Sequence, residues 1–356
     1  ELHVYAPTPQ AESTMVTLQA ISSLGWELEI ADCKNAFCQS DRLHRPKGSI
    51  FCEPCQGLNF GPGGLIELIA PVYGLKDAPL LWHRTLAQWL SEDGFSKSLL
   101  EPCLWVKRSS QGEIRSLILI EVGDLIVASA PAERQGLKDR LQGRFRFGKW
   151  ETGEADFAGR HAKQVGQKIF IDQEKYILEQ LAPLRLAKGR RSGPEAPLTP
   201  EEVKLCRTMV AQIQWLGRES RPDVSAGASI QSAALPSPTV SDAMLCIKIV
   251  KHLKGTASQK IVLWPLDPSI MSFAQWLSIL WRDLVFGDVS RPDWHLSQFP
   301  FSVVLSRDCT LSEGVETLSV VDAKSIFDTL SNSAGSRADR RNSIELAVVR
   351  DSMSAV

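Results

Sequence analysis

The apolar pattern is most regular near the middle of the chain, in residues 116–130. Two apolar segments, 117–120 and 125–128, flank a short insert that contains two carboxylates and a glycine: Glu121, Val122, Gly123 and Asp124. Short runs of Ile, Leu and Val predict buried strands, and the Gly-Asp pair predicts the tight turn of a hairpin. A buried carboxylate is costly unless it is paired or holds a cation. The pattern therefore fits either ordinary turn chemistry or a metal site.

The segment before this hairpin contains a helix and a strand. Apolar residues in 11–24 recur at helical spacing along one face, and Gly25 follows as a C-terminal stop. Residues 26–31 alternate as a strand whose end carries Asp32. One carboxylate at a strand end and a second at a hairpin tip can converge on divalent ions.

A third pattern predicts a helix that begins after Asp77. This residue occupies the N-cap position, Pro79 lies in the first turn, and the stripe of Trp82, Leu86, Trp89 and Leu90 has helical spacing. We expect the stripe to pack in the core rather than to stack on bases. Residues 168–171 are predicted as a strand, and further helices are predicted at 133–145, 173–181, 201–216 and 238–253, the last with Ser237 as N-cap and Pro238 at its first position.

Composition limits the class of protein. The 356 residues can form about two domains, and 40 Lys and Arg balance 41 Asp and Glu, so any nucleic-acid surface has to be a local groove. The start of the chain lacks the pattern of a secretory signal, and charged residues interrupt the longest apolar segment, 269–286. We expect an intracellular protein, cytoplasmic or nuclear, without a membrane span.

Two further patterns have more than one interpretation. Eight scattered cysteines fit reduced thiols, yet Cys52 and Cys55 form a CxxC near Cys33 and Cys38, so a zinc site is conceivable beside buried or incidental thiols. The Gly- and Pro-rich stretch 188–200 is the clearest linker. Its basic residues fit either contacts with a phosphate backbone or a solvated loop: Lys188, Arg190 and Arg191.

The order of several motifs carries a family resemblance. These are D-x-K-N-A-F at 32–37, Y-G-L-K-D-A-P-x-x-W at 73–82, E-P-C-L-W at 101–105, V-x-D-L-I-V-A at 122–128, F-A-G-R at 157–160, S-R-P-D at 220–223 and H-L-K-G-T at 252–256. Together they resemble the reverse transcriptase of copia-type retrotransposon polyproteins over about residues 1–265.

The resemblance implies an α+β fold with a right-hand polymerase palm, in which helices pack an antiparallel sheet. It further implies a helical connection region and a small, partly degraded α/β tail that resembles RNase H. The corresponding boundaries are 1–187 for fingers and palm with the start of the thumb, 188–200 for the linker, 201–265 for the helical region and 266–356 for the remnant.

The same resemblance implies a chemistry and assigns residues to it. Such polymerases extend a primer on an RNA or DNA template with dNTPs, by two-metal catalysis with Mg²⁺ or Mn²⁺. Asp32 matches the first palm aspartate and Asp124 a second metal ligand, so both are assigned as catalytic. Phe37 matches the aromatic residue that closes the sugar pocket, and Asp77 is assigned with it to substrate binding.

One position departs from the family pattern, which is aromatic-x-Asp-Asp at the hairpin. Here the motif is Glu121-Val122-Gly123-Asp124, so Gly123 replaces the aspartate that bridges both metals. Loss of one preorganised electrostatic group typically costs ~10²- to 10³-fold in rate, which predicts an impaired or inactive polymerase. Glu121 would share a strand face with Gly123 and is the alternative ligand.

In the tail, Asp288 and Asp322 are the acids that match RNase H-like motifs. The leading hypothesis for the chain is an RNA-directed DNA polymerase by descent, with metal binding weakened or lost. The alternatives are a non-catalytic nucleic-acid-binding relic of the retroelement and a pseudogene product without function.

Overall fold

The computed structural model describes residues 4–266, apart from 46–47, 56, 58–60, 62, 182–183, 185, 187–188 and 191–192. The predicted RNase H-like residues Asp288 and Asp322 lie outside the described residues, as does the apolar segment 269–286. Within the described part, no helix is both long and apolar enough to cross a membrane.

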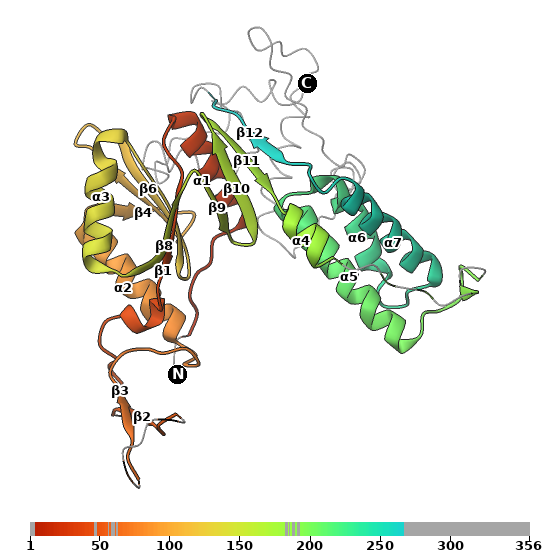
Figure 1. Ribbon diagram of the computed structural model, residues 1–356, viewed down its shortest axis with the longest axis horizontal. Helices are drawn as coiled ribbons and strands as arrows, with labels where there is room; N and C mark the ends of the chain where they lie inside the picture. The colour runs from red at the N-terminus through yellow and green to blue at the C-terminus, as the bar shows by residue number, and fades with distance from the viewer. Residues whose placement is uncertain are drawn as a thin grey trace, which may run out of the picture.

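A six-stranded antiparallel sheet forms the centre of the larger lobe (Figure 1). The strand order is β4-β5-β6-β7-β1-β8, so the earliest strand in the chain lies between two later ones. The strands are β1 Glu29–Cys33, β4 Phe95–Lys97, β5 Leu104–Arg108, β6 Ile114–Glu121, β7 Asp124–Ser129 and β8 Phe147–Thr152. The strand predicted at 26–31 thus begins and ends later and contains Asp32.

Both faces of this sheet are covered. Helices α2 Ala78–Glu92 and α3 Pro131–Arg144 pack on one face, where Trp82, Leu86 and Leu90 are fully buried, as predicted for the tryptophan stripe. Helix α1, Ala11–Leu24, and a second sheet cover the other face. Because β6 and β7 are buried on both sides, their sequences are nearly continuous apolar runs.

Helix α1 spans Ala11–Leu24 as predicted, and Gly25 ends it with a φ of 64°, a left-handed conformation that glycine adopts readily. Leu18 and Ile21 of the predicted apolar face are buried, and burial extends beyond that face. Most of the helix is buried, including Ser13 and Thr17, because it lies between two sheets. The Thr17 hydroxyl donates a hydrogen bond to the Ser13 carbonyl oxygen at 2.8 Å, which satisfies it in the core.

The second sheet has the order β12-β11-β10-β9 and is also antiparallel. Strand β12 comes from the end of the range 201–265, which was predicted to be helical. A separate two-stranded hairpin extends from the lower end of the larger lobe in Figure 1. The strands of these two sheets are β9 Glu154–Phe157, β10 Arg160–Val165, β11 Lys168–Asp172, β12 Ile261–Leu263, β2 Ile50–Cys52 and β3 Ile66–Leu68.

Four helices with their own core form the second lobe (Figure 1). The helix predicted at 201–216 is α5, Pro200–Glu219, and the apolar residues along one of its faces are buried: Cys206, Met209, Val210, Ile213 and Leu216. The elements are α4 Glu174–Glu179, α5 Pro200–Glu219, the short 3-10 helix η3 Pro222–Val224, α6 Ser225–Ala234 and α7 Val240–Gly255. The sequence did not predict α6, whose small residues lack a clear apolar period.

The start of α7 differs from the prediction of Ser237 as N-cap. Thr239 caps the helix, and its hydroxyl accepts a hydrogen bond from the Asp242 backbone at 3.4 Å. The Asp242 carboxylate accepts one from the Thr239 backbone at 2.8 Å. This reciprocal pair satisfies two free backbone N–H groups, which is why the helix begins there.

Candidate functional site

The antiparallel register places three carboxylates in one row across the six-stranded sheet. Asp32 of β1 lies directly opposite Asp124 of β7, and Glu121 of β6 lies opposite Asp124 on its other side. On β8, Lys149 lies opposite Asp32. Directly opposite residues project from the same face with Cβ atoms about 5 Å apart. The structure therefore brings Asp32 and Asp124 together, as the sequence predicted.

The hairpin turn is one residue earlier than predicted. Val122 and Gly123 form the turn, and Asp124 is already the first residue of β7. The proposal that Glu121 shares a strand face with Gly123 is wrong, because the turn interrupts the period of two between them. Glu121 instead faces the same side as Asp124.

Two hydrogen bonds hold the turn in place. The buried Trp82 indole of α2 donates to the Val122 carbonyl oxygen, and the Cys33 backbone donates to the Gly123 carbonyl oxygen at 2.8 Å. Val122 has a φ of 52°, which is unusual for a β-branched residue. These contacts fix the loop between Glu121 and Asp124 against β1 and α2.

The carboxylate row carries excess negative charge in a partly buried setting. Burial, and next the charge of Asp32, raise the pKa of Asp124. Burial also raises the pKa of Glu121; Arg160 opposes this rise and Asp124 adds to it. The neighbouring thiol of Cys33 has a raised pKa because of burial and of both aspartates. A nearby positive charge would favour the ionised forms of Asp124 and Glu121.

Gly148 of β8 allows the Asp32 carboxylate to lie where it does. The register between β1 and β8 shifts at this point, and a Cβ on Gly148 would lie only 2.8 Å from Asp32 Oδ2. A side chain at this position would displace the carboxylate. The sequence alone gives no sign of this role, since the contact of Gly148 with Asp32 depends on strand order.

Exposed cations surround the Asp32 end of the row. The Gln39 side chain donates to the carbonyl oxygens of Lys34 at 2.7 Å and Arg146 at 2.9 Å, and accepts from the Arg146 backbone at 2.6 Å. This clamp joins the turn after β1 to the segment before β8. Lys34, Arg146 and Lys149 are all exposed there, and within the described residues none of them forms an ion pair within 4 Å.

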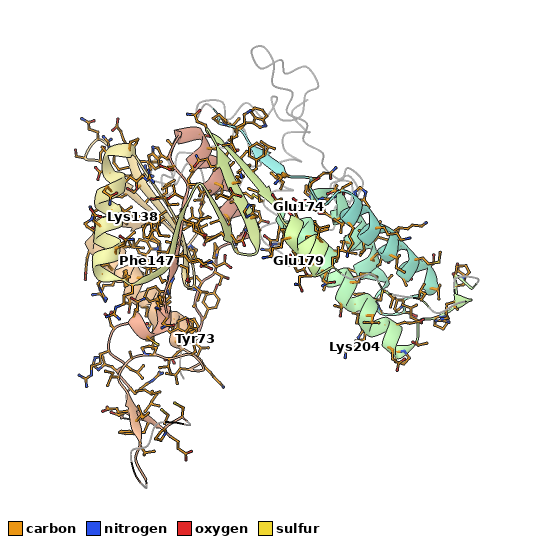
Figure 2. The ribbon with its side chains drawn as sticks, viewed as in Figure 1. Tyr73, Lys138, Phe147, Glu174, Glu179 and Lys204 are labelled. Atoms are coloured by element: carbon orange, nitrogen blue, oxygen red, sulfur yellow. The ribbon has the colours of Figure 1, made fainter. Side chains whose placement is uncertain are left out.

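Phe37, the predicted sugar-pocket residue, lies in the short 3-10 helix η1, Ala36–Gln39, directly after β1. It is half-buried, and its ring centroid lies 4.6 Å from that of Tyr73. Tyr73 is 64% exposed and lies at the end of the lobe from which the β2–β3 hairpin extends (Figure 2). The predicted sugar-pocket residue therefore has a largely exposed aromatic partner.

Asp77 occupies the N-cap position of α2, as predicted, but its side chain makes no capping hydrogen bond. Its buried carboxylate pairs instead with Arg45, whose Nη2 donates to Oδ1 at 2.6 Å. This hydrogen bond lowers the pKa of Asp77. The contact ties α2 to the segment that leads into β2.

Two further candidate sites from the sequence were the cysteine zinc site and the basic residues of the linker. Among the described residues, no group of three or more His, Cys, Asp or Glu side chains is arranged to hold a metal ion, so neither the four-cysteine zinc site nor a three-carboxylate site that includes Glu121 is formed. In the linker, Arg190 pairs with Glu202 at 2.7 Å, so it is not a free phosphate contact, while Lys188 and Arg191 lie outside the described residues.

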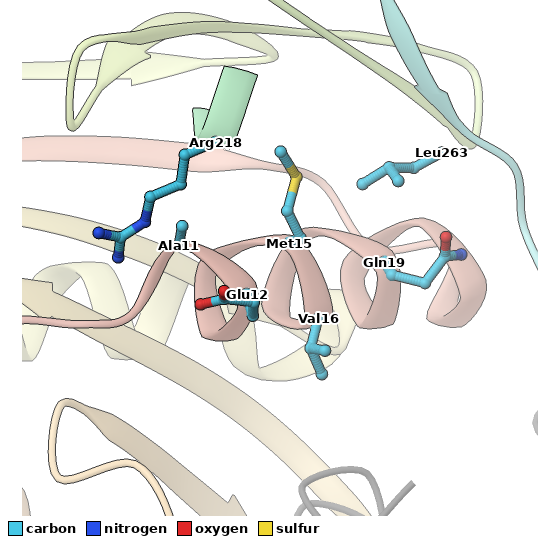
Figure 3. Close-up of a pocket in the computed structure, with 7 residues that line it drawn as sticks. All are labelled: Ala11, Glu12, Met15, Val16, Gln19, Arg218 and Leu263. Atoms are coloured by element: carbon cyan, nitrogen blue, oxygen red, sulfur yellow. The ribbon is translucent and has the colours of Figure 1, made fainter. Parts of the chain in front are cut away.

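A cavity of about 160 Å³ lies away from the carboxylate row, between α1, the end of α5 and β12 (Figure 3). It contains none of the predicted site residues. Its lining consists of Ala11, Glu12, Met15, Val16, Gln19, Arg218 and Leu263.

Comparison with known protein families identifies the family to which this chain belongs. Residues 2–191 match the family of reverse transcriptases, that is, RNA-dependent DNA polymerases. The match covers more than half of the chain, so the chain belongs to this family.

Individual relatives narrow the class to the reverse transcriptase region of copia-type Pol polyproteins. The retrovirus-related Pol polyprotein from transposon RE1 of Arabidopsis thaliana is 26% identical over 275 residues, which cover 73% of this chain and 18% of the relative. The corresponding polyprotein from transposon TNT 1-94 of Nicotiana tabacum is 23% identical over 293 residues, covering 76% and 22%. The chain thus spans about a fifth of the length of these polyproteins.

Proposed function

We propose that this chain is an RNA-directed DNA polymerase by descent, in which Asp32 and Asp124 form the cation-binding pair of the palm. The proposal rests on one observation above all: the register of β1 and β7 places these two acids directly opposite each other. Membership of the reverse transcriptase family supports it. The proposed substrates are dNTPs and a primer on an RNA or DNA template.

The residues present fit a divalent cation such as Mg²⁺ or Mn²⁺. Burial and mutual repulsion raise the pKa of Asp124, and a shared cation would relieve both effects. Asp32 and Asp124 would hold it. When bound, such ions activate the primer 3′-hydroxyl and stabilise charge on the transferring phosphoryl group. Lys34, Arg146 and Lys149 provide positive charge for a polyanionic substrate at the same end of the sheet.

We further propose that polymerase activity is impaired because Gly123 lacks the bridging carboxylate. The backbone at Gly123 would accept an aspartate. A Cβ there would make ordinary contacts, 3.5 Å from Ala36 Cβ and 3.8 Å from the Cys33 carbonyl oxygen, and its φ is not positive. The defect therefore lies in a missing charge rather than in a distorted turn.

Primer extension by the full chain with Mg²⁺ or Mn²⁺ tests this proposal. Gly123→Asp is expected to raise incorporation by roughly 100-fold or more, the scale of one electrostatic group in a site. Gly123→Ala fills the same space without charge and should not raise it. Adding Asp32→Ala to Gly123→Asp should abolish the gain.

Two results would contradict the proposal. Robust incorporation by the unmodified chain that depends on Asp32 would refute the impairment. No gain from Gly123→Asp, in a variant that keeps its stability, would show that the missing carboxylate does not limit the reaction.

A non-catalytic nucleic-acid-binding role is the second candidate, favoured by the exposed cations Lys34, Arg146 and Lys149. Such binding should weaken steeply with salt and ignore divalent metal. Filter binding to a primer-template, with Mg²⁺ and with EDTA, separates the two functions.

A further inference from the structure

His161 lies between two carboxylates on the exposed face of the second sheet. It belongs to β10, and its Nδ1 atom lies 2.9 Å from Asp156 Oδ1 and its Nε2 atom 3.2 Å from Glu154 Oε1. Both acids belong to β9, the strand at the edge of this sheet, where they alternate with the buried Ala155 and Phe157 (Figure 1). A single side chain of β10 thus holds the edge strand at two points.

The geometry of these contacts fits the protonated form of the ring. A neutral imidazole has one N–H donor, and its other nitrogen carries a lone pair that would face a carboxylate oxygen. An imidazolium donates from both nitrogens, and such charge-assisted hydrogen bonds are the stronger ones. His161 therefore satisfies Asp156 and Glu154 together only while it carries its second proton.

The charges around His161 also balance only when the ring is protonated. Asp172 of β11 lies directly opposite His161, on the side away from β9. Lys163 pairs with Glu154 at 2.7 Å, and Lys260, in the segment before β12, pairs with Asp172 at 2.7 Å. With the second acid of β9, three carboxylates face two lysines, and a charged His161 provides the third cation.

The pKa of His161 agrees with this geometry. Burial favours the neutral ring, but the hydrogen bonds with Asp156 and Glu154, and then the charges of Asp172 and Asp156, raise the pKa above its ordinary value. With a raised pKa in the folded state, the proton stabilises the fold fully below the ordinary histidine pKa of about 6.5. This contribution is lost as pH rises through the folded pKa.

The hairpin of β9 and β10 lies where the two sheets join. Gly153 separates β8 from β9; its N–H donates to the Leu28 carbonyl oxygen at 2.8 Å, and its carbonyl oxygen accepts from the Gln164 backbone at 2.6 Å. The Gln164 side chain donates to the Trp26 carbonyl oxygen at 2.8 Å and accepts from the Leu28 backbone at 2.7 Å. The hairpin is therefore connected to the segment that leads into β1.

We propose that His161 is a pH-sensitive switch, which holds the edge strand β9 on β10 while the ring is protonated and loosens this strand when the ring loses its proton. The switch lies at the junction of the two sheets and outside the carboxylate row. It does not depend on the proposed polymerase chemistry.

Hydrogen exchange and NMR of the full chain test the switch between about pH 5 and about pH 9, the range in which histidine titrates. Exchange of residues 154–165 is expressed as protection relative to an unstructured chain at the same pH. This protection should fall about 2- to 5-fold as pH rises, the scale of one exposed ion pair. The fall should have the same midpoint as the ring signal of His161, which lies above the ordinary pKa of histidine and is assigned by its loss in His161→Gln.

Two variants separate the switch from a general effect of pH. His161→Gln should have the low protection of the parent at high pH and no pH step. Asp156→Asn with Glu154→Gln removes both charges, so it should move the ring titration and the pH step to lower pH. The substituted side chains are 34 to 74% exposed, so both variants are expected to fold.

His44→Gln is the matched control, because His44 is exposed and, within the described part of the chain, forms no ion pair within 4 Å. It should keep the pH step of the parent. Protection that does not change with pH in the parent would overturn the proposal, as would a step that persists in His161→Gln. Unchanged midpoints after loss of both carboxylates would overturn it too, since these acids would then not hold the proton.

Discussion

Replacement of Gly148 by alanine is expected to disable the carboxylate pair while leaving the fold intact. The new Cβ would lie 2.8 Å from Asp32 Oδ2, whereas ordinary contacts begin near 3.4 Å, so the oxygen has to retreat by about 0.6 Å. Metal sites tolerate errors of about 0.2 Å in ligand position. We therefore expect a roughly 10- to 100-fold loss of Mn²⁺ affinity, comparable to that caused by mutation of groups that orient a ligand.

The same change should have little effect on stability. The displaced atom is the end of an exposed side chain, and Gly→Ala at a compatible backbone adds roughly 0.4 to 1 kcal/mol through the unfolded chain. Urea unfolding should therefore give a free energy within about 1 kcal/mol of the parent.

Gly143→Ala in α3 serves as the control, because a Cβ at this position would meet no neighbouring atom within 4 Å. It should keep the parental Mn²⁺ affinity, as measured by electron paramagnetic resonance of free Mn²⁺. Asp32→Asn should abolish binding. Parental Mn²⁺ affinity in Gly148→Ala, together with loss in Asp32→Asn, would refute the idea that Gly148 seats the carboxylate.

Two further predictions concern stability and pH. The pKa of Asp124 is raised in the folded state, so this group stabilises the fold only at low pH, and its contribution is lost as pH rises through the folded pKa. Asp124→Asn should therefore increase the free energy of unfolding by about 0.2 to 1 kcal/mol at pH 7 in EDTA. This gain should vanish on acidification. A less stable variant at pH 7 in urea unfolding would contradict this. The pKa of Asp77 is lowered in the folded state, so its contribution to stability is present at neutral pH and is lost as pH falls through the folded pKa. Asp77→Asn should lower the free energy of unfolding by up to about 3 kcal/mol at pH 7, because Arg45 loses its buried partner. Glu113→Gln, which breaks an exposed pair with Arg115, should cost less than about 1 kcal/mol in the same assay.

Local sequence determined most of the elements. Helix α1 ends at Gly25, the apolar stripe of α2 is buried, and the arms of the β6–β7 hairpin lie where the apolar runs predicted them. Periods of 3.6 and 2 and the special conformations of glycine and proline act over a few residues, so a short window of sequence contains them. Helix ends were less predictable, because alternative caps such as Ser237 and Thr239 lie close together.

The family resemblance, which the comparisons confirm, predicted that Asp32 and Asp124 lie close together in space. The apolar pattern alone predicted only that each acid lies at the end of a strand. Only the tertiary structure decided which groups surround them. Gly148 meets Asp32 because β8 lies beside β1, and Arg160 pairs with Glu219 because the start of β10 lies against the end of α5. Strand order and the contact between lobes join segments far apart in the chain, and no local period or propensity encodes which distant segment becomes the neighbour.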